Sequence, residues 1–289
     1  MCIRDRLKRL GEVAKEMKKT APVAIRFNPN VDAGVHEFTK TGRKSDKFGV
    51  SIESTKDLVK RCLKNDSIKL VGLTCHIGSQ IMELKGFEDA AKQALELLIE
   101  LDKLNISLDF IDMGGGLGVN YVGEETIQPF ELIQIYEEIF SGRNERLILE
   151  PGRSISANAG IMLTRVEYKK NNFLIADAAM NDLLRPALYQ AHHDVWPIIK
   201  NEQISNVNLV GPICETGDFL AKNIDIGACE GDLLAVKTVG AYGFVMSSNY
   251  NSRPRAAEVI VVKDNFYLIR KREDYADLTF LEEGLDDQV

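Results

Sequence analysis

Four groups of residues in this chain could carry chemistry, and each follows a short apolar run. They are Arg26 with Asn28, and the segments 76–79, 114–116 and 150–153. Taken one at a time, each group has an ordinary structural explanation, because a lone histidine is usually a packing residue and three glycines usually make a tight turn. At the ends of successive strands of one parallel sheet, however, they would lie together and form a site.

These residue types could bind a phosphorylated aromatic ring that contains a basic nitrogen. Gly114–Gly116, which we expect to precede a helix, would offer backbone N–H groups and a helix dipole to a phosphate, and Ser79 would add a hydroxyl. The His76 ring could lie flat on the ligand, and the Glu150 carboxylate could pair with a protonated ring nitrogen. The glycine spacing does not match a nucleotide-binding loop, because Val119 stands at its last position. The combination predicts pyridoxal 5'-phosphate.

The elements that must position these groups alternate between strand and helix. Apolar runs predict strands at residues 23–27, 70–76, 108–113 and 146–149. Apolar faces at helical spacing predict helices near residues 7–17, 54–64, 87–101 and 130–140, the second with Ser54 as its N-cap. This alternation is typical of a buried parallel sheet. Four units cannot close an eight-stranded barrel, so we expect either a small open sheet or the C-terminal half of a (β/α)8 TIM-type barrel.

The sequence changes character after about residue 160. Short apolar runs such as residues 173–176, 207–210, 233–239 and 259–262 are separated by Gly, Pro, Asn and Asp. They predict mostly β-structure, including a hairpin over residues 259–269. We therefore expect an α/β domain at residues 1–158, followed by a β-barrel or β-sandwich domain at residues 159–289.

Composition limits the classes of function. The chain has 289 residues, of which 45% are hydrophobic and 27% charged, with a net charge of −7, so we expect a globular protein that coats neither nucleic acid nor an anionic membrane. Five scattered cysteines without a Cys-x-x-Cys pair predict neither disulfides nor a zinc site, and adjacent His192 and His193 are expected in a surface loop rather than at a metal. Without a signal peptide or a membrane-length apolar run, the expected location is the cytoplasm.

Seven motifs in order make the sequence recognisable. They resemble the motif series of the diaminopimelate decarboxylase family, which belongs to the alanine-racemase-like fold class (fold type III) of pyridoxal-phosphate enzymes. The motifs are His76-Ile-Gly-Ser-Gln80, Asp112-Met-Gly-Gly-Gly-Leu-Gly118, Glu150-Pro-Gly-Arg153, Asn181-Asp-Leu-Leu-Arg-Pro-Ala-Leu-Tyr189, Cys214-Glu-Thr-Gly-Asp218, Gly240-Ala-Tyr-Gly243 and Asn249-Tyr-Asn-Ser-Arg-Pro254. The resemblance runs from about Val23 to near residue 272.

The resemblance implies a role for each matching position. In the cofactor site, His76 would stack on the ring, Ser79 and the backbone of Gly115 and Gly116 would hold the phosphate, and Glu150 would face the pyridine nitrogen. The family's remaining cofactor contacts fall on Pro151, Gly152, Arg153 and Tyr242. The substrate contacts fall on Arg153, Arg185, Tyr189, Glu215 and Tyr242, and Cys214 would be the proton donor. In relatives the residues that match Cys214 and Glu215 reach the active site of the partner chain, so the resemblance also implies a homodimer.

Several of these residues have ordinary explanations as well. Arg185 could be a surface ion-pair partner, Tyr189 could belong to the core, and Cys214 could be a buried structural thiol. We expect Asp218 and Arg165 to be structural, and we expect no chemistry from the other four cysteines.

The chain departs from the family in one respect. The lysine that carries the cofactor covalently, within a Tyr-Ala-x-Lys-Ala-like motif on the first barrel strand, has no counterpart here, and Lys40, Lys44 and Lys47 lie in an unrelated loop. We therefore expect a chain that begins in the middle of a barrel, is inactive alone, and is prone to aggregate through the strand at residues 23–27.

The implied reaction is decarboxylation of meso-2,6-diaminopimelate to L-lysine and carbon dioxide, the last step of lysine biosynthesis. A related decarboxylase of ornithine, arginine or carboxynorspermidine is the nearest alternative, although the segments 185–189 and 214–218 look like the diaminopimelate branch. The other alternative is a regulatory homologue without the lysine and without catalysis, but such a binder would need few of the retained site residues.

Overall fold

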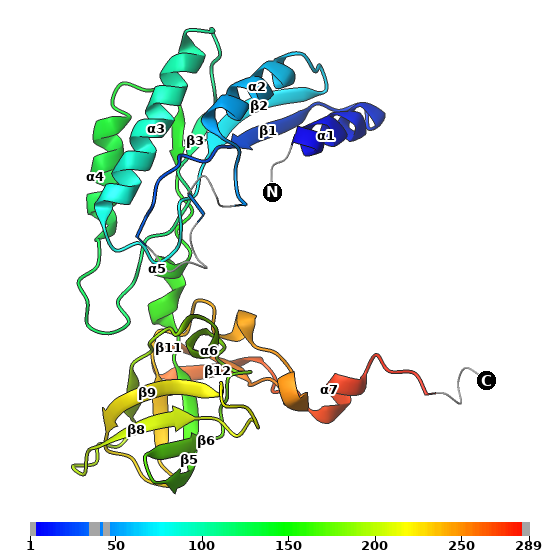
Figure 1. Ribbon diagram of the computed structural model, residues 1–289. Coiled ribbons are helices and arrows are strands. Elements are labelled where there is room, and N and C mark those ends of the chain that lie inside the picture. The colour runs from blue at the N-terminus through cyan, green and yellow to red at the C-terminus, as the bar shows by residue number, and fades with distance from the viewer. Residues whose placement is uncertain (1–3, 35–40, 43–46, 285–289) are drawn as a thin grey trace. The chain divides into compact units, whose positions relative to one another are not determined.

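The computed structural model describes residues 4–34, 41–42 and 47–284. The chain forms two compact units, Met1–Ile155 and Ser156–Val289, which we call unit 1 and unit 2 and describe separately (Figure 1). The helices of unit 1 are α1 (Arg4–Glu16), α2 (Ile52–Leu63), α3 (Leu84–Asp102), α4 (Pro129–Ile139) and the short α5 (Arg153–Ser156). Its strands are β1 (Ala21–Arg26), β2 (Ile68–Thr74), β3 (Phe110–Asp112) and β4 (Arg146–Ile148).

The four strands of unit 1 form one parallel sheet in the order β1-β2-β3-β4. Consecutive parallel strands joined by right-handed crossovers place their helices on the same face, so α2, α3 and α4 cover one side of the sheet (Figure 1). The core between them includes Leu73 and Ile111 from the sheet and Phe87 and Leu98 from α3. The predicted parallel sheet and its four strand–helix units are confirmed.

Helix α2 begins earlier than predicted. Its N-cap is Ser51 rather than Ser54, and the Ser51 hydroxyl accepts a hydrogen bond from the backbone N–H of Ser54 at 3.1 Å. The sequence predicts one apolar face of Leu58, Val59, Cys62 and Leu63. The first three are buried, whereas Leu63 is 60% exposed. The apolar spacing therefore located the helix, but two serines three residues apart gave the same capping signal.

Unit 2 is built around a six-stranded sheet in the order β7-β10-β5-β6-β8-β9. These strands are β5 (Met162–Lys170), β6 (Phe173–Ala176), β7 (Val195–Pro197), β8 (Ser205–Val210), β9 (Phe219–Ile226) and β10 (Leu233–Val236). Neighbouring strands are antiparallel except for β6 and β8, which are parallel. Strands β5, β7 and β9 were not predicted. Helix α6 (Arg185–Tyr189) and the 3-10 turns Ala157–Ala159, Phe244–Met246 and Tyr250–Ser252 complete this part.

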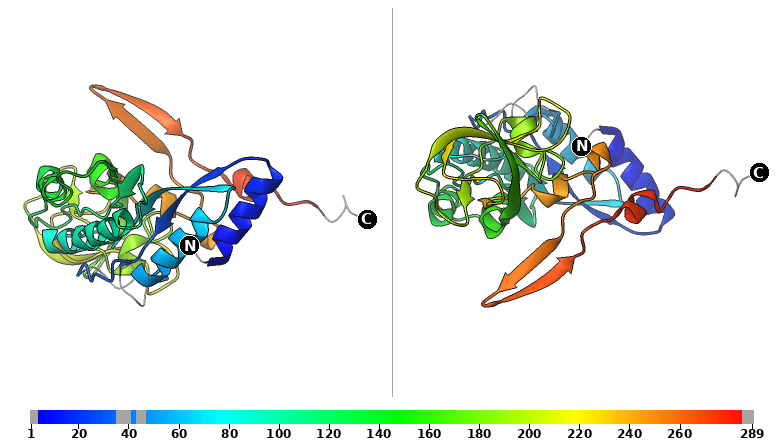
Figure 2. Two further views of the ribbon diagram at one scale, coloured as in Figure 1. Left: turned by 90° about the horizontal axis from the view of Figure 1, so that it is seen from above. Right: turned by 90° about the horizontal axis from the view of Figure 1, so that it is seen from below.

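A separate hairpin of β11 (Glu258–Val262) and β12 (Asn265–Arg270) follows, and the short helix α7 (Tyr275–Thr279) comes after it. The hairpin confirms the prediction for residues 259–269, and Lys263 in its tight turn has a φ of 55°. It projects from the rest of unit 2 (Figure 2). Its large apolar side chains are exposed, Val261 and Phe266 most of all, at 70% and 78%.

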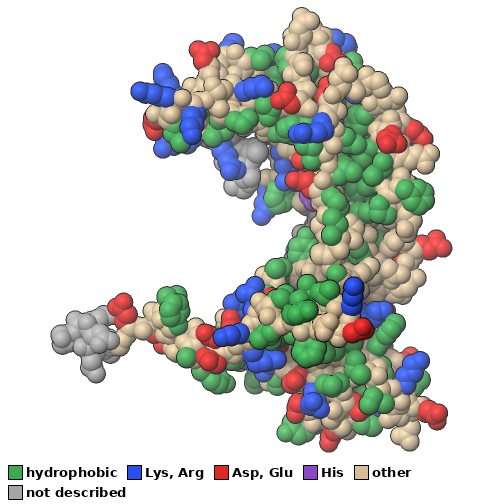
Figure 3. Space-filling view, turned by 180° about the vertical axis from the view of Figure 1, so that it is seen from behind, with side chains coloured by type: hydrophobic (Ala, Val, Ile, Leu, Met, Phe, Trp, Pro, Cys, Tyr) green, Lys and Arg blue, Asp and Glu red, His purple; other side chains and the backbone are tan. Residues whose placement is uncertain are grey.

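Charged and apolar side chains are mixed on the visible surface. Lys and Arg side chains are interspersed with Asp and Glu side chains on the face shown in Figure 3. Within the described residues, none of the helices has the length and apolar character needed to cross a membrane.

Candidate functional site

The C-terminal ends of the four parallel strands of unit 1 are aligned in register. Arg26 pairs with Thr74, Thr74 with Asp112, and Asp112 with Ile148. Alternate positions along a strand point to opposite faces. Ile25, Leu73 and Ile111 point into the core beside the helices, so Arg26, Thr74 and Asp112 point to the other face of the sheet.

The sequence-predicted residues of unit 1 stand two positions beyond this row. They are Asn28, His76, Gly114 and Glu150, one after each strand. Because adjacent strands lie about 4.8 Å apart, four neighbouring chain segments of this kind span a distance that one cofactor-sized molecule can bridge.

The glycine triplet lies between His76 and Glu150 and contacts both. The N–H of Gly115 donates a hydrogen bond to Nδ1 of His76 at 3.2 Å, and the N–H of Glu150 donates to the carbonyl oxygen of Gly114 at 2.8 Å. A side chain at Gly115 would overlap the Glu150 carbonyl oxygen. The structure thus brings together the three predicted elements of the cofactor site. It also shows that the N–H of Gly115 is already engaged by His76.

The helix predicted near residues 130–140 is confirmed as α4, but it does not begin at the glycines, as the expected contact between its dipole and a phosphate requires. Residues 113–128 contain no helix, and α4 begins only at Pro129, where Gln128 and Glu131 form a capping box. The loop of residues 117–128 therefore separates Gly114–Gly116 from the start of α4. The triplet instead makes two tight turns, with φ values of 70° at Gly114 and 115° at Gly116.

Asp112 holds the start of this loop. Its two carboxylate oxygens accept hydrogen bonds from the backbone N–H of Gly114 at 2.8 Å and from the hydroxyl of Thr74 at 3.1 Å. The side chain is 9% exposed, so these bonds form in a largely dry environment. Asp112 belongs to a motif quoted from the sequence, but its local role was not predicted.

His76 is held as a neutral ring. Burial, and next the nearby Arg26 guanidinium, hold the pKa of the imidazole below its usual value of 6.5, while the Asp112 carboxylate acts in the opposite direction. A backbone N–H points at Nδ1, so the ring proton must be on Nε2. The carbonyl of His76 accepts from the Thr41 hydroxyl at 2.7 Å and from Arg26 Nη2 at 3.5 Å.

Arg153 and Ser79 also lie together. Arg153 begins α5, is 8% exposed, and donates from Nη2 to the Ser79 hydroxyl at 3.0 Å and from Nη1 to the Tyr121 hydroxyl at 2.7 Å. Tyr121 was missed from the sequence because it stands in a long loop without a motif. Gln80 steadies that loop by exchanging two hydrogen bonds with the backbone of Val119.

Glu150, Pro151 and Gly152 are exposed. The backbone of Glu150 is held by Gly114, as described above, and its carboxylate faces solvent. This combination of a fixed backbone and an accessible carboxylate suits a residue that must meet a ligand.

In unit 2, Arg185 is buried rather than a surface residue. It begins α6, is 6% exposed, and its Nη1 lies 2.7 Å from Nε2 of His193. His193 is fully buried, and its Nδ1 lies 2.8 Å from the carbonyl oxygen of Lys237. The prediction that both neighbouring histidines lie in a surface loop is therefore wrong for His193, because the chain folds back after α6. His192 is exposed, 3.4 Å from Asp194.

Cys214 and Glu215 lie on an exposed loop held by Asp218. The buried Asp218 carboxylate accepts hydrogen bonds from the N–H groups of Met180 at 2.7 Å and Ile213 at 2.8 Å, and its burial raises its pKa. Cys214 is exposed and is not the buried thiol considered as an alternative. The Asp218 contacts agree with the structural role expected for it.

Tyr250 contacts this loop from another motif. Its hydroxyl donates to Glu215 Oε2 at 2.6 Å, and that bond raises the pKa of the phenol. Asn181 bonds to the backbone of Ser248 and to Arg253, so the first and last of the unit 2 motifs are joined.

Tyr242 has an unusual backbone. Its φ is 59°, a left-handed value that few non-glycine residues adopt, and its side chain is 42% exposed. Gly240 and Gly243 on either side pack against the backbone of Ser156 and Val239 so closely that a Cβ would overlap them. Such strain at an exposed aromatic residue is typical of functional positions. Tyr189, which ends α6, is half-buried.

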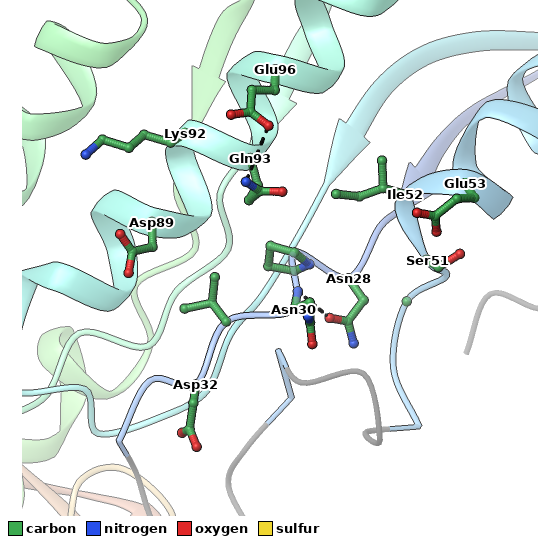
Figure 4. A pocket seen from close by; sticks show the side chains of 13 residues that line it. Asn28, Asn30, Asp32, Ser51, Ile52, Glu53, Asp89, Lys92, Gln93 and Glu96 are labelled. Carbon is green, nitrogen blue, oxygen red and sulfur yellow. Dashed lines mark hydrogen bonds between the residues drawn. The ribbon is translucent and has the colours of Figure 1, made fainter.

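Unit 1 also has a pocket of about 710 Å³ between the loop after β1, the start of α2, and α3 (Figure 4). Its described lining includes Asn28, Asp32, Glu53 and Lys92. The pocket shares Asn28 with the row of residues after the strands, but His76, Ser79, Glu150 and Arg153 do not line it.

The other residues considered in the sequence are lysines, cysteines and possible metal ligands. Lys47 is exposed near the Phe48 ring, whereas Lys40, Lys44 and Cys2 lie outside the described residues. Burial raises the pKa of the Cys62 thiol to about 11 and that of Cys75 to about 12, which suits unreactive thiols. In the described part of the chain, no group of three His, Cys, Asp or Glu residues could hold a metal ion.

Comparison with known proteins identifies related sequences and folds. Residues 1–157 match the family model of the pyridoxal-dependent decarboxylase, pyridoxal binding domain. The diaminopimelate decarboxylase of Pseudomonas aeruginosa is 48% identical over 95% of this chain and 67% of its own length, and that of Vibrio cholerae is 45% identical over 96% and 68%. The chain thus spans about two thirds of these relatives.

Solved structures of related decarboxylases have a similar fold. Diaminopimelate decarboxylase from Helicobacter pylori, complexed with L-lysine, has a TM-score of 0.93 at 39% identity and covers 98% of this chain and 72% of its own. A lysine/ornithine decarboxylase from Vibrio vulnificus, complexed with cadaverine, has a TM-score of 0.74 at 21% identity, covering 87% of this chain and 65% of its own, and shows a shared fold only.

Proposed function

Since the chain belongs to the diaminopimelate decarboxylase family of pyridoxal-dependent decarboxylases, we propose that it carries the site at which meso-2,6-diaminopimelate is converted to L-lysine and carbon dioxide with pyridoxal 5'-phosphate. The observation that carries this proposal is the chain of contacts from His76 through Gly115 and Gly114 to Glu150. It places a neutral ring, a glycine turn and an exposed carboxylate beside one another.

The residues of unit 1 fit the cofactor. His76 would stack on the ring, and Ser79 with the backbone of Gly115 and Gly116 would hold the phosphate. Because the N–H of Gly115 already donates to His76, we assign the main backbone contact to Gly116. Pro151, Gly152 and Tyr242 would complete the enclosure.

The chemistry divides between the cofactor and the chain. Pyridoxal phosphate, when bound, supplies an electron sink for the pair released as carbon dioxide leaves. The Glu150 carboxylate would keep the ring nitrogen protonated and the sink electron-poor. Cys214 would donate the thiol proton to the former α-carbon, so that the carboxylate lost as carbon dioxide is replaced by hydrogen.

The substrate carries two carboxylates and two ammonium groups. Arg153 and Arg185 offer planar guanidinium groups that match a carboxylate, and Glu215 offers a negative charge to the distal ammonium. Tyr189 and Tyr242 would complete this binding site.

The fold class and assembly are part of the same proposal. Four aligned parallel strands with helices on one face are the arrangement of half a (β/α)8 barrel, so we propose that residues 1–158 are a partial barrel and residues 159–289 a β-barrel or β-sandwich domain. Cys214 and Glu215 are exposed, which supports a homodimer in which they reach the partner's site. We place the reaction in the cytoplasm.

Equilibrium dialysis with pyridoxal phosphate tests the cofactor site. We expect this chain to retain the cofactor, and His76→Ala or Ser79→Ala to weaken retention about tenfold or more. His192→Gln, a change at an exposed histidine of unit 2, serves as the control. Equal retention by all four proteins would contradict the assigned site.

Release of labelled carbon dioxide from meso-diaminopimelate, L-ornithine and L-arginine tests the reaction. The chain has no Tyr-Ala-x-Lys-Ala-like motif, so we expect no release by the chain alone and no lysine modified after borohydride reduction. When the chain is joined to the lysine-bearing segment of a relative, we expect release from meso-diaminopimelate in preference to the other two. Preference for ornithine or arginine would favour the related decarboxylases. Cofactor retention with no release from any substrate, even after that segment is joined, would favour a non-catalytic homologue.

A further inference from the structure

We propose that Gln80 is a positioning residue for the cofactor phosphate, because its side-chain amide joins the loop that carries Ser79 to the loop that carries Gly116. The inference rests on the proposed function, which assigns Ser79 and Gly116 to the phosphate, and it adds a residue to which that function gives no role. Gln80 would act through the two loops and would not itself touch the phosphate.

The Gln80 amide makes two hydrogen bonds to a single residue of the other loop. Its Nε2 donates to the carbonyl oxygen of Val119 at 2.5 Å, and its Oε1 accepts from the N–H of Val119 at 3.1 Å. Because one bond needs a donor and the other an acceptor, the amide is held in one orientation. Val119 is 5% exposed, so its backbone groups have little access to water as an alternative partner.

Backbone hydrogen bonds continue the connection at the next residue. The N–H of Ile81 donates to the carbonyl oxygen of Gly116 at 2.9 Å, and the N–H of Gly118 donates to the carbonyl oxygen of Ile81 at 3.0 Å. Together with the two bonds of the Gln80 amide, four hydrogen bonds therefore connect residues 80–81 to residues 116–119. Gly116 is tied into this connection through its own carbonyl group.

Arg153 connects the same two loops a second time. It donates from Nη2 to the hydroxyl of Ser79, which directly precedes Gln80, and from Nη1 to the hydroxyl of Tyr121, two residues after Val119. Loss of the Gln80 amide would remove two of the four hydrogen bonds described above. The Ser79 hydroxyl and the Gly116 backbone should then move relative to one another, which weakens their joint hold on one phosphate.

The backbone of Gln80 supports a specific role for its side chain. Its φ is 64°, a left-handed value that glycine adopts without strain and that other residues adopt at a cost. A glycine at this position would avoid the cost but would lack the amide. The two hydrogen bonds to Val119 offset the strain that the glutamine introduces.

Equilibrium dialysis with pyridoxine 5'-phosphate and pyridoxine tests the proposal. These ligands differ only in the phosphate, so the ratio of their affinities isolates its contribution, and neither has an aldehyde that could react with lysines. Gln80→Met keeps the length of the side chain but removes both hydrogen bonds, and it should lower this ratio about tenfold. An equal loss of affinity for both ligands, or an unchanged ratio, would overturn the proposal.

The matched control is Gln134→Met, at an exposed glutamine of α4 whose amide donates to Glu138. It makes the same change of side chain in unit 1 and should leave both affinities unchanged. A similar fall of the ratio in this variant would also overturn the proposal.

Hydrogen exchange of the unaltered chain gives a second readout, which does not depend on the folding of a variant. If the joined loops favour phosphate, bound phosphate must favour the joined loops by the same factor. Exchange of the Val119 N–H, which donates to Gln80, should therefore slow about tenfold more at saturation with pyridoxine 5'-phosphate than with pyridoxine. Equal exchange rates with the two ligands would overturn the proposal.

The same measurements separate this proposal from the proposed function. If the unaltered chain binds neither ligand, the cofactor site of the proposed function fails, and the role of Gln80 fails with it. If the unaltered chain prefers pyridoxine 5'-phosphate and Gln80→Met has the same preference, the cofactor site stands and only the role of Gln80 fails.

Discussion

Replacement of Gly114 by alanine tests how the glycine turn holds the site together. With a φ of 70°, an alanine there would adopt a left-handed backbone, which costs about 1–2 kcal/mol. Its Cβ would also lie 2.5 Å from the carbonyl oxygen of Cys75 and 2.9 Å from Nδ1 of His76. Because the first of these atoms is backbone, β2 or the turn must move by about 0.9 Å to reach an ordinary contact of 3.4 Å, at a further cost of about 1–3 kcal/mol.

Two other glycines separate these contributions. Gly142 has a φ of 75° but open space around it, so Gly142→Ala should show the backbone cost alone. Gly152 has open space and no left-handed backbone, so Gly152→Ala should leave stability nearly unchanged. We expect the unfolding free energy to be highest for Gly152→Ala, lower for Gly142→Ala and lowest for Gly114→Ala.

Urea unfolding followed by circular dichroism measures this order. Tryptophan fluorescence would not, because the single tryptophan, Trp196, lies in unit 2. A further loss of about 1–3 kcal/mol in Gly114→Ala relative to Gly142→Ala corresponds to several degrees in melting temperature. Equal stability of these two variants would refute the claim that the turn is tightly packed against His76.

Four further predictions concern single residues. Burial lowers the pKa of His76 below 6.5, so the unfolded chain binds more protons at this ring as the pH falls. Between about pH 7.5 and 5.5, the urea midpoint should therefore fall more steeply in the unaltered chain than in His76→Gln. Parallel curves would contradict the pKa assignment. Asp112→Asn removes the anion that raises the pKa of His76, so an NMR titration should show that pKa lower still, and an unchanged value would exclude the interaction. Asp218→Ala leaves the N–H groups of Met180 and Ile213 without their acceptor and should destabilise unit 2 by about 1–3 kcal/mol in urea unfolding, whereas Asp225→Ala, at an exposed residue, should not. Val261→Lys on the exposed hairpin should reduce concentration-dependent light scattering, and unchanged scattering would show that self-association uses another surface.

Much of unit 1 could be predicted because its strands are short, apolar and buried. A run such as Leu70–Thr74 is distinguishable from the surrounding helices by its shorter length, and the polar residues after each run mark the strand ends. The strands of unit 2 were harder to predict. β9 carries Lys222, Asn223 and Asp225 in its middle, and β5 ends in exposed polar residues, so neither has a clear apolar pattern.

The errors in the candidate site have a common cause. Three glycines after a strand predict a helix start, but here the loop continues to Pro129. Two adjacent histidines look alike in sequence, yet one is exposed and the other is buried against Arg185. Tyr121 reaches Arg153 from a loop without periodicity. These positions depend on how distant segments fold back on one another, and local spacing does not encode that.

The two ends of the sheet should tolerate insertions and deletions differently, because the C-terminal ends of the strands are aligned in one row of Arg26, Thr74, Asp112 and Ile148. Inserting one residue within β2 or β3 would turn the following side chains to the opposite face and remove His76 or the glycine turn from the site. Loops at the other end, such as the turn around Asn105 between α3 and β3, can lengthen without that effect. Insertions and deletions accumulated during evolution, and insertion sites chosen by engineers, should therefore fall at that end of the sheet.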